Sequence, residues 1–390
     1  MSELIEKIKN SNSIYQIAFQ DMPINNIKAK NYISTCRLLM GTIDLRARSG
    51  TFTTPYRANL QPGYELFKLR YIDNSLSDLY DARALEIFNY AKKNNKKINI
   101  CWSGGIDSTS VLTAFLKNLS KNDLEILNVL STGSSIIENY DFYKNFISQK
   151  IKCSSINSII LNDDFLNKNI LLTGDPADCI FGCSIGMYRD FINRQEHLQP
   201  WKNHYKKMIE KLDMIGKEFS PSTATFGSWY VKKISDNLEE VGQADYLNTI
   251  ADWWWWAYFN FRWQCEVERM FINLRPLNSR ESISESNIKD FQKYTFFNTE
   301  NFQLWSYSNI KKLITDDITQ HKAAPKKYIT EFTKNEIFQK NKVKVALPGP
   351  NHRLRSKIEL PYFYDKNWQG YTKTHEIHEI FKMLLEKYNG

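Results

Sequence analysis

The sequence lacks the features that mark several common classes of protein. Its six cysteines have no disulfide-scaffold spacing and its N-terminus has no apolar signal core, so we expect a reducing, cytoplasmic setting. It contains no Gly-x4-Gly-Lys-Ser/Thr segment, which excludes the common kinase-type phosphate loop. No apolar run is long and uninterrupted enough to span a bilayer, so we expect no membrane partner.

The length and composition indicate a globular protein with a substantial core. With 390 residues, 42% of them hydrophobic, the chain is expected to form one large or two moderate domains. We predict a small α+β extension over residues 1–74 and a main domain over residues 75–390. The net charge of +9 is compatible with an anionic nucleotide or with nucleic acid. Because the lysines are spread along the chain, nucleic acid is the less favoured of the two.

The most informative segment is an apolar strand that runs into Ser103-Gly104-Gly105-Ile106-Asp107-Ser108 and is followed by an apolar helix. Two glycines let the backbone approach an oxyanion, and the N–H groups at the start of the helix point toward it. The two serine hydroxyls can donate hydrogen bonds to the same group. Because Asp107 would repel a bare phosphate, its carboxylate indicates a bridging Mg²⁺. The segment therefore predicts a nucleotide–metal site.

Short strands and helices alternate around this segment. We expect strands at residues 98–102, 124–130, 156–161 and 170–173, and helices at residues 75–93, 109–119 and 139–151. This alternation predicts an α/β fold with a doubly wound, mainly parallel sheet. Ligands of such sheets bind beyond the carboxyl ends of the strands. From about Met187 onward the pattern becomes mostly helical.

A second acidic loop, Gly174-Asp175-Pro176-Ala177-Asp178, follows the last of these strands. Asp175 and Asp178 are three positions apart, so a short helical turn would place both carboxylates on one face. Such a pair by itself is typical of a helix cap. Opposite Asp107, however, the pair favours a metal site built from two strand ends.

The first motif resembles the pyrophosphate loop of the N-type ATP pyrophosphatases, which cleave ATP between the α and β phosphates. Together with Gly174-Asp175-x-x-Asp178-x-x-Phe181-Gly182, it resembles the synthetase domain of the asparagine synthetase family. That family carries Gly-Glu-x-x-Asp-Glu-x-Phe-Gly in its second loop, so Asp175 and Cys179 each stand in place of a glutamate. The resemblance implies a fold like that of the adenine nucleotide alpha hydrolases.

The resemblance also implies roles for individual residues. Asp107 and Asp178 would be the Mg²⁺ ligands, and Asp175 would lie beside an acyl-adenylate. The segment Ile337–Lys342 is similar to the family segment whose lysine contacts the α-phosphate; Lys342 fits that lysine best, with Lys340 as the fallback. We expect the nucleotide to contact Trp102, Ser103, Gly104, Gly105, Asp107, Ser108 and Gly174, with adenine near Leu130 and Ser131.

These implications add up to an ATP-dependent, amide-forming ligase with Mg²⁺ as its metal. It would adenylate a small-molecule carboxylate, release pyrophosphate, and transfer the acyl group to ammonia or an amine. Only about 75 residues precede the main domain, too few for a glutaminase domain. We therefore expect free ammonia, an amine substrate, or a separate glutaminase or amine-donor subunit; assembly into a homo-oligomer stays open.

An alternative is a pyrophosphate-loop enzyme that adenylates a nucleobase or a tRNA base for modification. The basic balance and the aromatic content suit such a substrate. A thiolation enzyme would need a reactive cysteine near the loop, and Cys153 is the candidate between the two motifs. Against this alternative stands the second motif, which points to activation of a carboxylate.

Four consecutive tryptophans, Trp253 to Trp256, form the most unusual apolar segment. Four neighbours cover every side of a helix, and a helix that is apolar all round is normally buried in a large core. A platform on which bases stack is the sharper alternative. We expect burial.

Overall fold

The structure is a computed structural model that describes residues 48, 52–53, 59–60, 66–148, 150–156, 159–181, 196–210, 213, 227–263, 266–267, 284–313 and 322–336. The chain divides into two compact units. One, here called the sheet unit, contains Asn74–Ala177, Leu274–Phe302 and Asp317–Gly390. The other, here called the aromatic unit, contains Met1–Asp73, Asp178–Asn273 and Gln303–Asp316.

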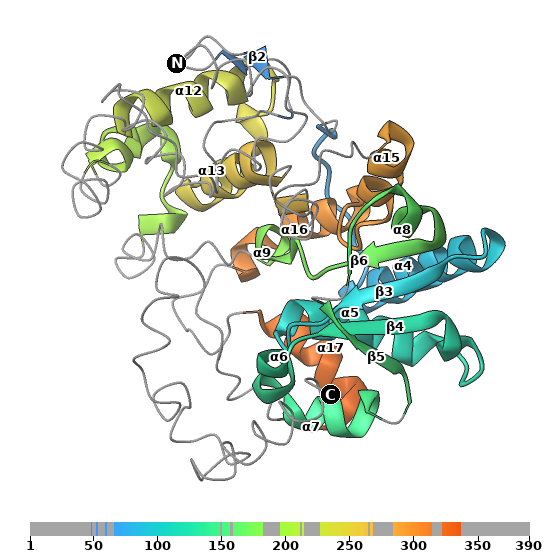
Figure 1. The fold of residues 1–390 in the computed structure, drawn as a ribbon. Helices are drawn as coiled ribbons and strands as arrows, with labels where there is room; N and C mark the ends of the chain where they lie inside the picture. Colours follow the sequence, from blue (N-terminus) through green and yellow to red (C-terminus); the bar gives the residue numbers. More distant parts are fainter. Residues whose placement is uncertain are drawn as a thin grey trace, which may run out of the picture. The chain divides into compact units, whose positions relative to one another are not determined.

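The sheet unit is built on four parallel strands (Figure 1). These are β3 (Lys97–Cys101), β4 (Leu127–Ser131), β5 (Lys152–Ser155) and β6 (Asn169–Leu172), and their order in the sheet is β5-β4-β3-β6. Ile98 of β3 pairs with Leu127 on one side and with Ile170 on the other. All four strands point the same way, so their carboxyl ends share one edge. The predicted α/β fold with a parallel sheet is confirmed at this level.

Three helices pack against one another over β3. They are α4 (Leu76–Lys93), α5 (Ile106–Asn118) and α17 (Ala323–Thr333). The helix predicted for residues 75–93 is confirmed, and Ser75 caps it by accepting a hydrogen bond of 3.1 Å from the backbone N–H of Asp78. The helix predicted for residues 109–119 begins three residues earlier, at Ile106. This earlier start puts Asp107 in the first helical turn.

Three expected elements differ from the structure. The strand predicted at residues 124–130 begins only at Leu127, because Asp123–Ile126 form the 3-10 turn η1. The helix predicted for residues 139–151 is instead α6 (Gly133–Glu138), the short α7 (Tyr140–Phe142) and the π-helical η2 (Tyr143–Ile147). Thr132 accounts for the early start of α6, because its hydroxyl accepts from the backbone N–H of Ser135. The strand predicted at residues 156–161 is β5, four residues earlier, so that prediction was wrong in position.

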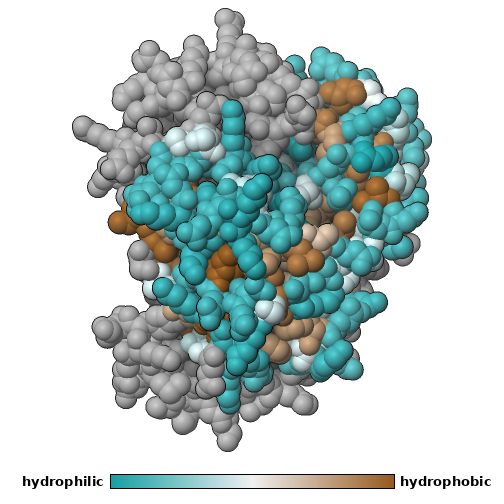
Figure 2. Space-filling model, turned by 90° about the vertical axis from the view of Figure 1, so that its right-hand side faces the viewer, coloured by the Kyte–Doolittle hydropathy of each residue, from teal (hydrophilic) through white to brown (hydrophobic). Residues whose placement is uncertain are grey.

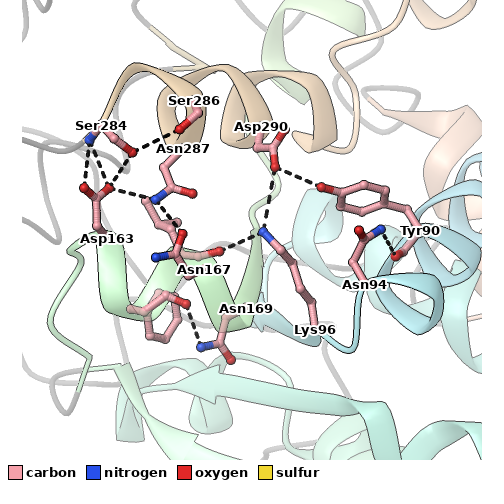
Figure 3. Close-up of polar contacts among 12 residues, drawn as sticks. Tyr90, Asn94, Lys96, Asp163, Asn167, Asn169, Ser284, Ser286, Asn287 and Asp290 are labelled. Carbon is pink, nitrogen blue, oxygen red and sulfur yellow. Dashed lines mark hydrogen bonds and ion pairs between the residues drawn. The ribbon is translucent and has the colours of Figure 1, made fainter.

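Polar contacts tie the remaining helices of the sheet unit together (Figure 3). These helices are α8 (Asp163–Lys168), which follows the single turn η1 (Asp123–Ile126) and β5 along the chain, and α15 (Glu285–Tyr294). The carboxylate of Asp163 accepts hydrogen bonds from Ser284 and Asn287 at the start of α15. Further along α15, Asp290 accepts a bond of 2.9 Å from Tyr90 of α4. These contacts hold α15 beside β6.

A ladder of polar side chains crosses the sheet from one edge to the other. Ser154 donates to Asn128, Asn128 donates to Asn99, and Asn99 donates to Asn169, over distances of 2.8–3.0 Å. Asn169 in turn donates to the backbone oxygen of Phe165 at 2.8 Å. Each amide thus has a partner on a neighbouring strand, although Asn99 itself is buried.

The described part of the aromatic unit is mainly helical. Its longer helices are α12 (Gly227–Glu240), α13 (Ile250–Ala257) and α16 (Glu300–Leu313), the last beginning in the sheet unit. Shorter pieces are β1 (Phe52–Thr53), β2 (Asn59–Leu60), α9 (Ala177–Ile180), η4 (Glu196–Leu198), η5 (Trp201–His204), η6 (Ala244–Tyr246) and the π-helical η7 (Tyr258–Arg262). All four tryptophans of residues 253–256 are buried, so the prediction of burial is confirmed and no ring of this run is available for base stacking.

On the face drawn in Figure 2, the described residues form a mostly hydrophilic surface in which hydrophobic residues make up smaller patches. The large hydrophobic side chains exposed among the described residues are Tyr71, Leu85, Ile160, Leu198 and Tyr246. None of the described helices combines the length and the hydropathy needed to cross a membrane.

Candidate nucleotide site

The loop between β3 and α5 is held in shape by its own serines. The hydroxyl of Ser108 accepts from the backbone N–H of Ser103 at 3.0 Å and lies 3.0 Å from the Ser103 hydroxyl. The Ser103 hydroxyl also accepts from the N–H of Gly105, at 3.2 Å. A hydroxyl has one proton to donate, so Ser108, which also contacts the carbonyl of Gly105, is engaged within the loop. Ser103 is exposed and Ser108 is buried, so Ser103 is the hydroxyl that faces outward.

Gly104 has a conformation and a setting that only glycine tolerates. Its φ is +75°, in the left-handed region. A Cβ at this position would also collide with the backbone oxygen of Ser135 and lie 2.9 Å from the Cβ of Glu138. Both neighbours belong to α6, which therefore closes one side of the loop. The buried Glu138 carboxylate is close as well, with Oε1 3.7 Å from where a Cβ of Gly105 would be.

Gly174 brings the second loop against the first. A Cβ on Gly174 would lie 2.8 Å from the backbone nitrogen of Ser108 and 2.9 Å from the Cβ of Asp107. Real Cβ atoms do not approach other atoms so closely, so this position requires glycine. The two sequence motifs, separated by about 70 residues in the chain, meet where β3 and β6 end.

Asp107 forms an ion pair with Lys322, the residue that precedes α17. The Nζ of Lys322 donates to Oδ2 of Asp107, and the two side chains are only 10% and 24% exposed. Such a shielded pair is screened by solvent less than a surface ion pair. Lys322 has a φ of +56°, which is uncommon for a residue with a side chain. The structure thus places a buried cation directly beside the predicted metal ligand.

Sequence reasoning did not find Lys322. It is one of many lysines, and 215 positions separate it from Asp107, so no local spacing connects the two. The predicted cations Lys342 and Lys340 lie outside the described residues, and their roles remain predictions.

Asp175 lies near the carboxyl end of β3. Burial raises the pKa of the Cys101 thiol, and the negative charge of Asp175 raises it further, which shows that the carboxylate is close to the last residue of that strand. The backbone N–H of Asp175 donates to the hydroxyl of Thr173 at 3.1 Å. Asp175 is therefore part of the same cluster of loops as Gly174.

Asp178 begins the second segment of the aromatic unit, so its pairing with Asp107 stays a prediction. Within its own unit it lies near Arg262. Burial lowers the pKa of Arg262, but the negative charges of Glu266 and, to a smaller extent, Asp178 outweigh this effect, and the pKa is raised well above its ordinary value. Arg262 donates to Glu266 at 2.7 Å. The charge of Asp178 thus acts on a guanidinium that Glu266 holds in place.

The residues expected to contact adenine lie at the carboxyl end of β4. Leu130 and Ser131 are buried, and the Ser131 hydroxyl lies 3.3 Å from the thiol of Cys153. Trp102 is also buried; its indole N–H donates to Thr109 at 3.0 Å and its backbone N–H to Leu130 at 2.8 Å. Any contact of Trp102 with a nucleotide would therefore involve backbone atoms, since its ring packs in the core.

Within the described residues, no three His, Cys, Asp or Glu side chains form a group that could hold a metal ion by themselves. No protein-family model matches the chain, and no curated protein is significantly similar to it. Two glycines at close approach, a helix start and a shielded Asp–Lys pair meet at one edge of a parallel sheet.

Proposed function

We propose that the chain is an ATP-dependent ligase that adenylates a carboxylate, releases pyrophosphate, and transfers the acyl group to ammonia or an amine. The observation that carries this proposal is the seating of Gly174 against Asp107 and Ser108. It joins the two motifs on which the resemblance to asparagine synthetase-type domains rests.

The strand order supports a doubly wound sheet of the adenine nucleotide alpha hydrolase type. Along the chain the sheet grows from β3 to β5 in one direction, and β6 then adds on the other side of β3. The order therefore reverses between β3 and β6. Open α/β sheets bind ligands in the crevice beyond the strand ends at such a reversal. Both predicted loops follow these two strands.

The loop after β3 fits a pyrophosphate. Gly104 and Gly105 present backbone without side chains, and Gly105 caps α5 with no side-chain hydrogen bond to its first turn. The N–H groups of that turn and the dipole of the 13-residue α5 favour an anion there. Ser103 can turn its exposed hydroxyl toward the same group.

The resemblance assigns the Mg²⁺ of a magnesium nucleotide to Asp107 and Asp178. Mg²⁺ usually takes one or two carboxylates and completes its shell with phosphates and water, so a larger acidic cluster is not required. When bound, it would offset the negative charge of the phosphates. Lys322 adds a positive charge beside Asp107, where it can stabilise charge that develops on the phosphates.

The test is the exchange of labelled pyrophosphate into ATP, measured across a panel of carboxylates and nucleobases. We expect exchange that depends on a carboxylate, with AMP as the other product. Release of ADP, or no exchange with any substrate, would contradict the proposal. Asp107→Ala should lower exchange at least about 10²-fold. Asp164→Ala, on the exposed face of α8, should leave it unchanged.

One observation favours the alternative substrate, a nucleobase or tRNA base. Of the three cysteines in the described part of the chain, none of them in a disulfide, Cys101 and Cys179 are buried and Cys153 is partly exposed. Cys153 lies beside Ser131, close to the expected adenine position. The same panel decides between the two, because exchange that depends on a nucleobase and disappears in Cys153→Ser would favour the alternative.

A further inference from the structure

We propose that Tyr80 is a positioning residue that holds Asp107 and Lys322 together, an inference that rests on the proposed function of this pair. Tyr80 belongs to α4, whereas Asp107 begins α5 and Lys322 precedes α17. Its side chain is fully buried between these two helices and does not reach the loop itself. Its hydroxyl forms a hydrogen bond with Ser110 of α5, and its ring stacks on Tyr328 of α17.

The hydroxyl side is a two-step chain of hydrogen bonds. Tyr80 lies 2.8 Å from the Ser110 hydroxyl, and that hydroxyl donates to the backbone oxygen of Asp107 at 2.8 Å. Ser110 has one proton and gives it to Asp107, so Tyr80 must be the donor in the first step. The chain runs in one direction, from Tyr80 to the backbone of the first turn of α5.

The ring side is a stack. The ring of Tyr80 lies 4.6 Å from that of Tyr328 in α17, with 12° between their planes. Tyr328 is itself fixed, because its hydroxyl donates to Asp81 of α4 at 2.6 Å. Three phenylalanines, Phe296, Phe297 and Phe302, contact the ring of Tyr80 at 5.5–5.7 Å and close the pocket around it. Tyr80 therefore has little freedom to move independently of α17.

The electrostatics agree with this placement. Burial is the main reason that the pKa of Tyr80 is raised; the charge of Asp107 adds to this rise and the charge of Lys322 reduces it. Both members of the ion pair are thus close enough to act on the same buried hydroxyl. A neutral donor at this point stabilises the backbone beneath the Asp107 carboxylate without competing for the charge of Lys322.

Tyr80→Phe removes only the hydroxyl, and Tyr90→Phe is its matched control. Tyr90 is also on α4, stacks on Tyr294 at 3.9 Å and donates to Asp290 at 2.9 Å (Figure 3). In pyrophosphate exchange we expect Tyr80→Phe to lower kcat about tenfold, with KM for ATP changed less than about twofold. Tyr90→Phe should change neither value.

A second measurement does not depend on activity. Acetylation of Lys322 by an N-hydroxysuccinimide ester, followed by peptide mass spectrometry, reports how firmly the ammonium is held. Exposed Lys327 serves as the internal reference. We expect labelling of Lys322 relative to Lys327 to rise about threefold in Tyr80→Phe and to stay unchanged in Tyr90→Phe. Equal labelling of Lys322 in the wild type and in Tyr80→Phe would overturn the proposal.

The two measurements separate this proposal from the proposed function. If labelling of Lys322 rises as expected but the wild type catalyses no exchange, the positioning role stands and the proposed function fails. If the wild type catalyses exchange but labelling of Lys322 does not rise in Tyr80→Phe, the proposed function stands and the positioning role fails. Ser110→Ala removes the middle hydroxyl of the same chain of hydrogen bonds, and it replaces Tyr80→Phe in the test if that variant does not fold. It should raise labelling as much as Tyr80→Phe, and the double variant should add nothing further.

Discussion

The two units of the chain are both rich in aromatic side chains, but they use polar groups in opposite ways. In the aromatic unit, the indole N–H groups of Trp253, Trp255 and Trp256 each donate to a buried side-chain oxygen, at 2.6–3.0 Å. In the sheet unit, the carboxylate of Asp107, after β3, pairs with the ammonium of Lys322, before α17, and both residues are partly exposed. The first arrangement satisfies polar groups within a core, whereas the second places a charged pair near the end of a strand. The difference shows that aromatic content alone does not distinguish the tryptophan-rich core from the candidate site.

The largest effect should come from breaking the core of the aromatic unit. Trp253→Ala removes a fully buried indole and leaves Ser235 of α12 without its partner. We expect a loss of about 3–5 kcal/mol in the free energy of unfolding. Guanidinium unfolding followed by fluorescence measures this loss, and Trp253→Phe should cost less. A stable Trp253→Ala variant would show that this run of tryptophans is not the core of its unit.

A smaller but more specific effect should follow from adding one methyl group in the sheet unit. Gly174→Ala forces the two loops apart, because its Cβ would meet Asp107 and Ser108 at under 3 Å. A displacement of about 1 Å in a site commonly costs about 10²-fold, and we expect such a loss in pyrophosphate exchange. Circular dichroism should show that the fold is kept.

Gly242→Ala in the aromatic unit is the control for this change. A Cβ there would meet no atom within 4 Å, although the backbone has a φ of +66°. The left-handed conformation should cost about 1–2 kcal/mol of stability, with no change in exchange. Equal losses of exchange in both variants would erase the distinction between the two units.

The smallest effect concerns pH and the contact between α8 and α15. Hydrogen bonds from Asn287 and Ser284 lower the pKa of Asp163 (Figure 3). Since the folded pKa lies below the unfolded value of about 3.9, the stabilisation is present above that pH and is lost as the pH falls through the folded pKa. In urea unfolding at pH 7 and pH 3, we expect Asp163→Asn to show a smaller loss on acidification than the wild type. Asp164→Asn should behave as the wild type does, since Asp164 is exposed.

Strands β3 and β6 could be predicted from the sequence because most of their residues are apolar. Residues 98–101 and 170–172 are nearly continuous runs of buried residues, which is the pattern of a parallel sheet covered on both faces, although β6 lies at one edge of the sheet. The edge strand β5 was misplaced because Lys152, Cys153, Ser154 and Ser155 carry little apolar character. The strand was predicted at Ile156–Leu161 instead, because this segment is more apolar. Strand β5, at the other edge, is less buried than β6, and its position is set by pairing with β4.

The two loops of the candidate site could be predicted from the sequence, but the lysine that pairs with Asp107 could not. Gly104, Asp107 and Gly174 belong to motifs whose spacing is local, and the structure brings all three to one place. Lys322 reaches Asp107 only because α17 packs on α5, a contact between distant segments that no local pattern encodes. The role of Tyr80 was hidden for the same reason, since a tyrosine at an apolar helix position is indistinguishable from ordinary core.

The asparagine ladder across the sheet limits how this chain can change. A slip of one residue between β3 and β4 would turn Asn99 and Asn128 to opposite faces and break the hydrogen bond between them, at a cost because Asn99 is buried. The same four side chains, Ser154, Asn128, Asn99 and Asn169, therefore keep the ends of β3 and β6 level, which is where the two loops must meet. A variant that replaces one of these four side chains leaves its neighbours without a hydrogen-bond partner. Sequences descended from this one should therefore change these positions together or keep them all.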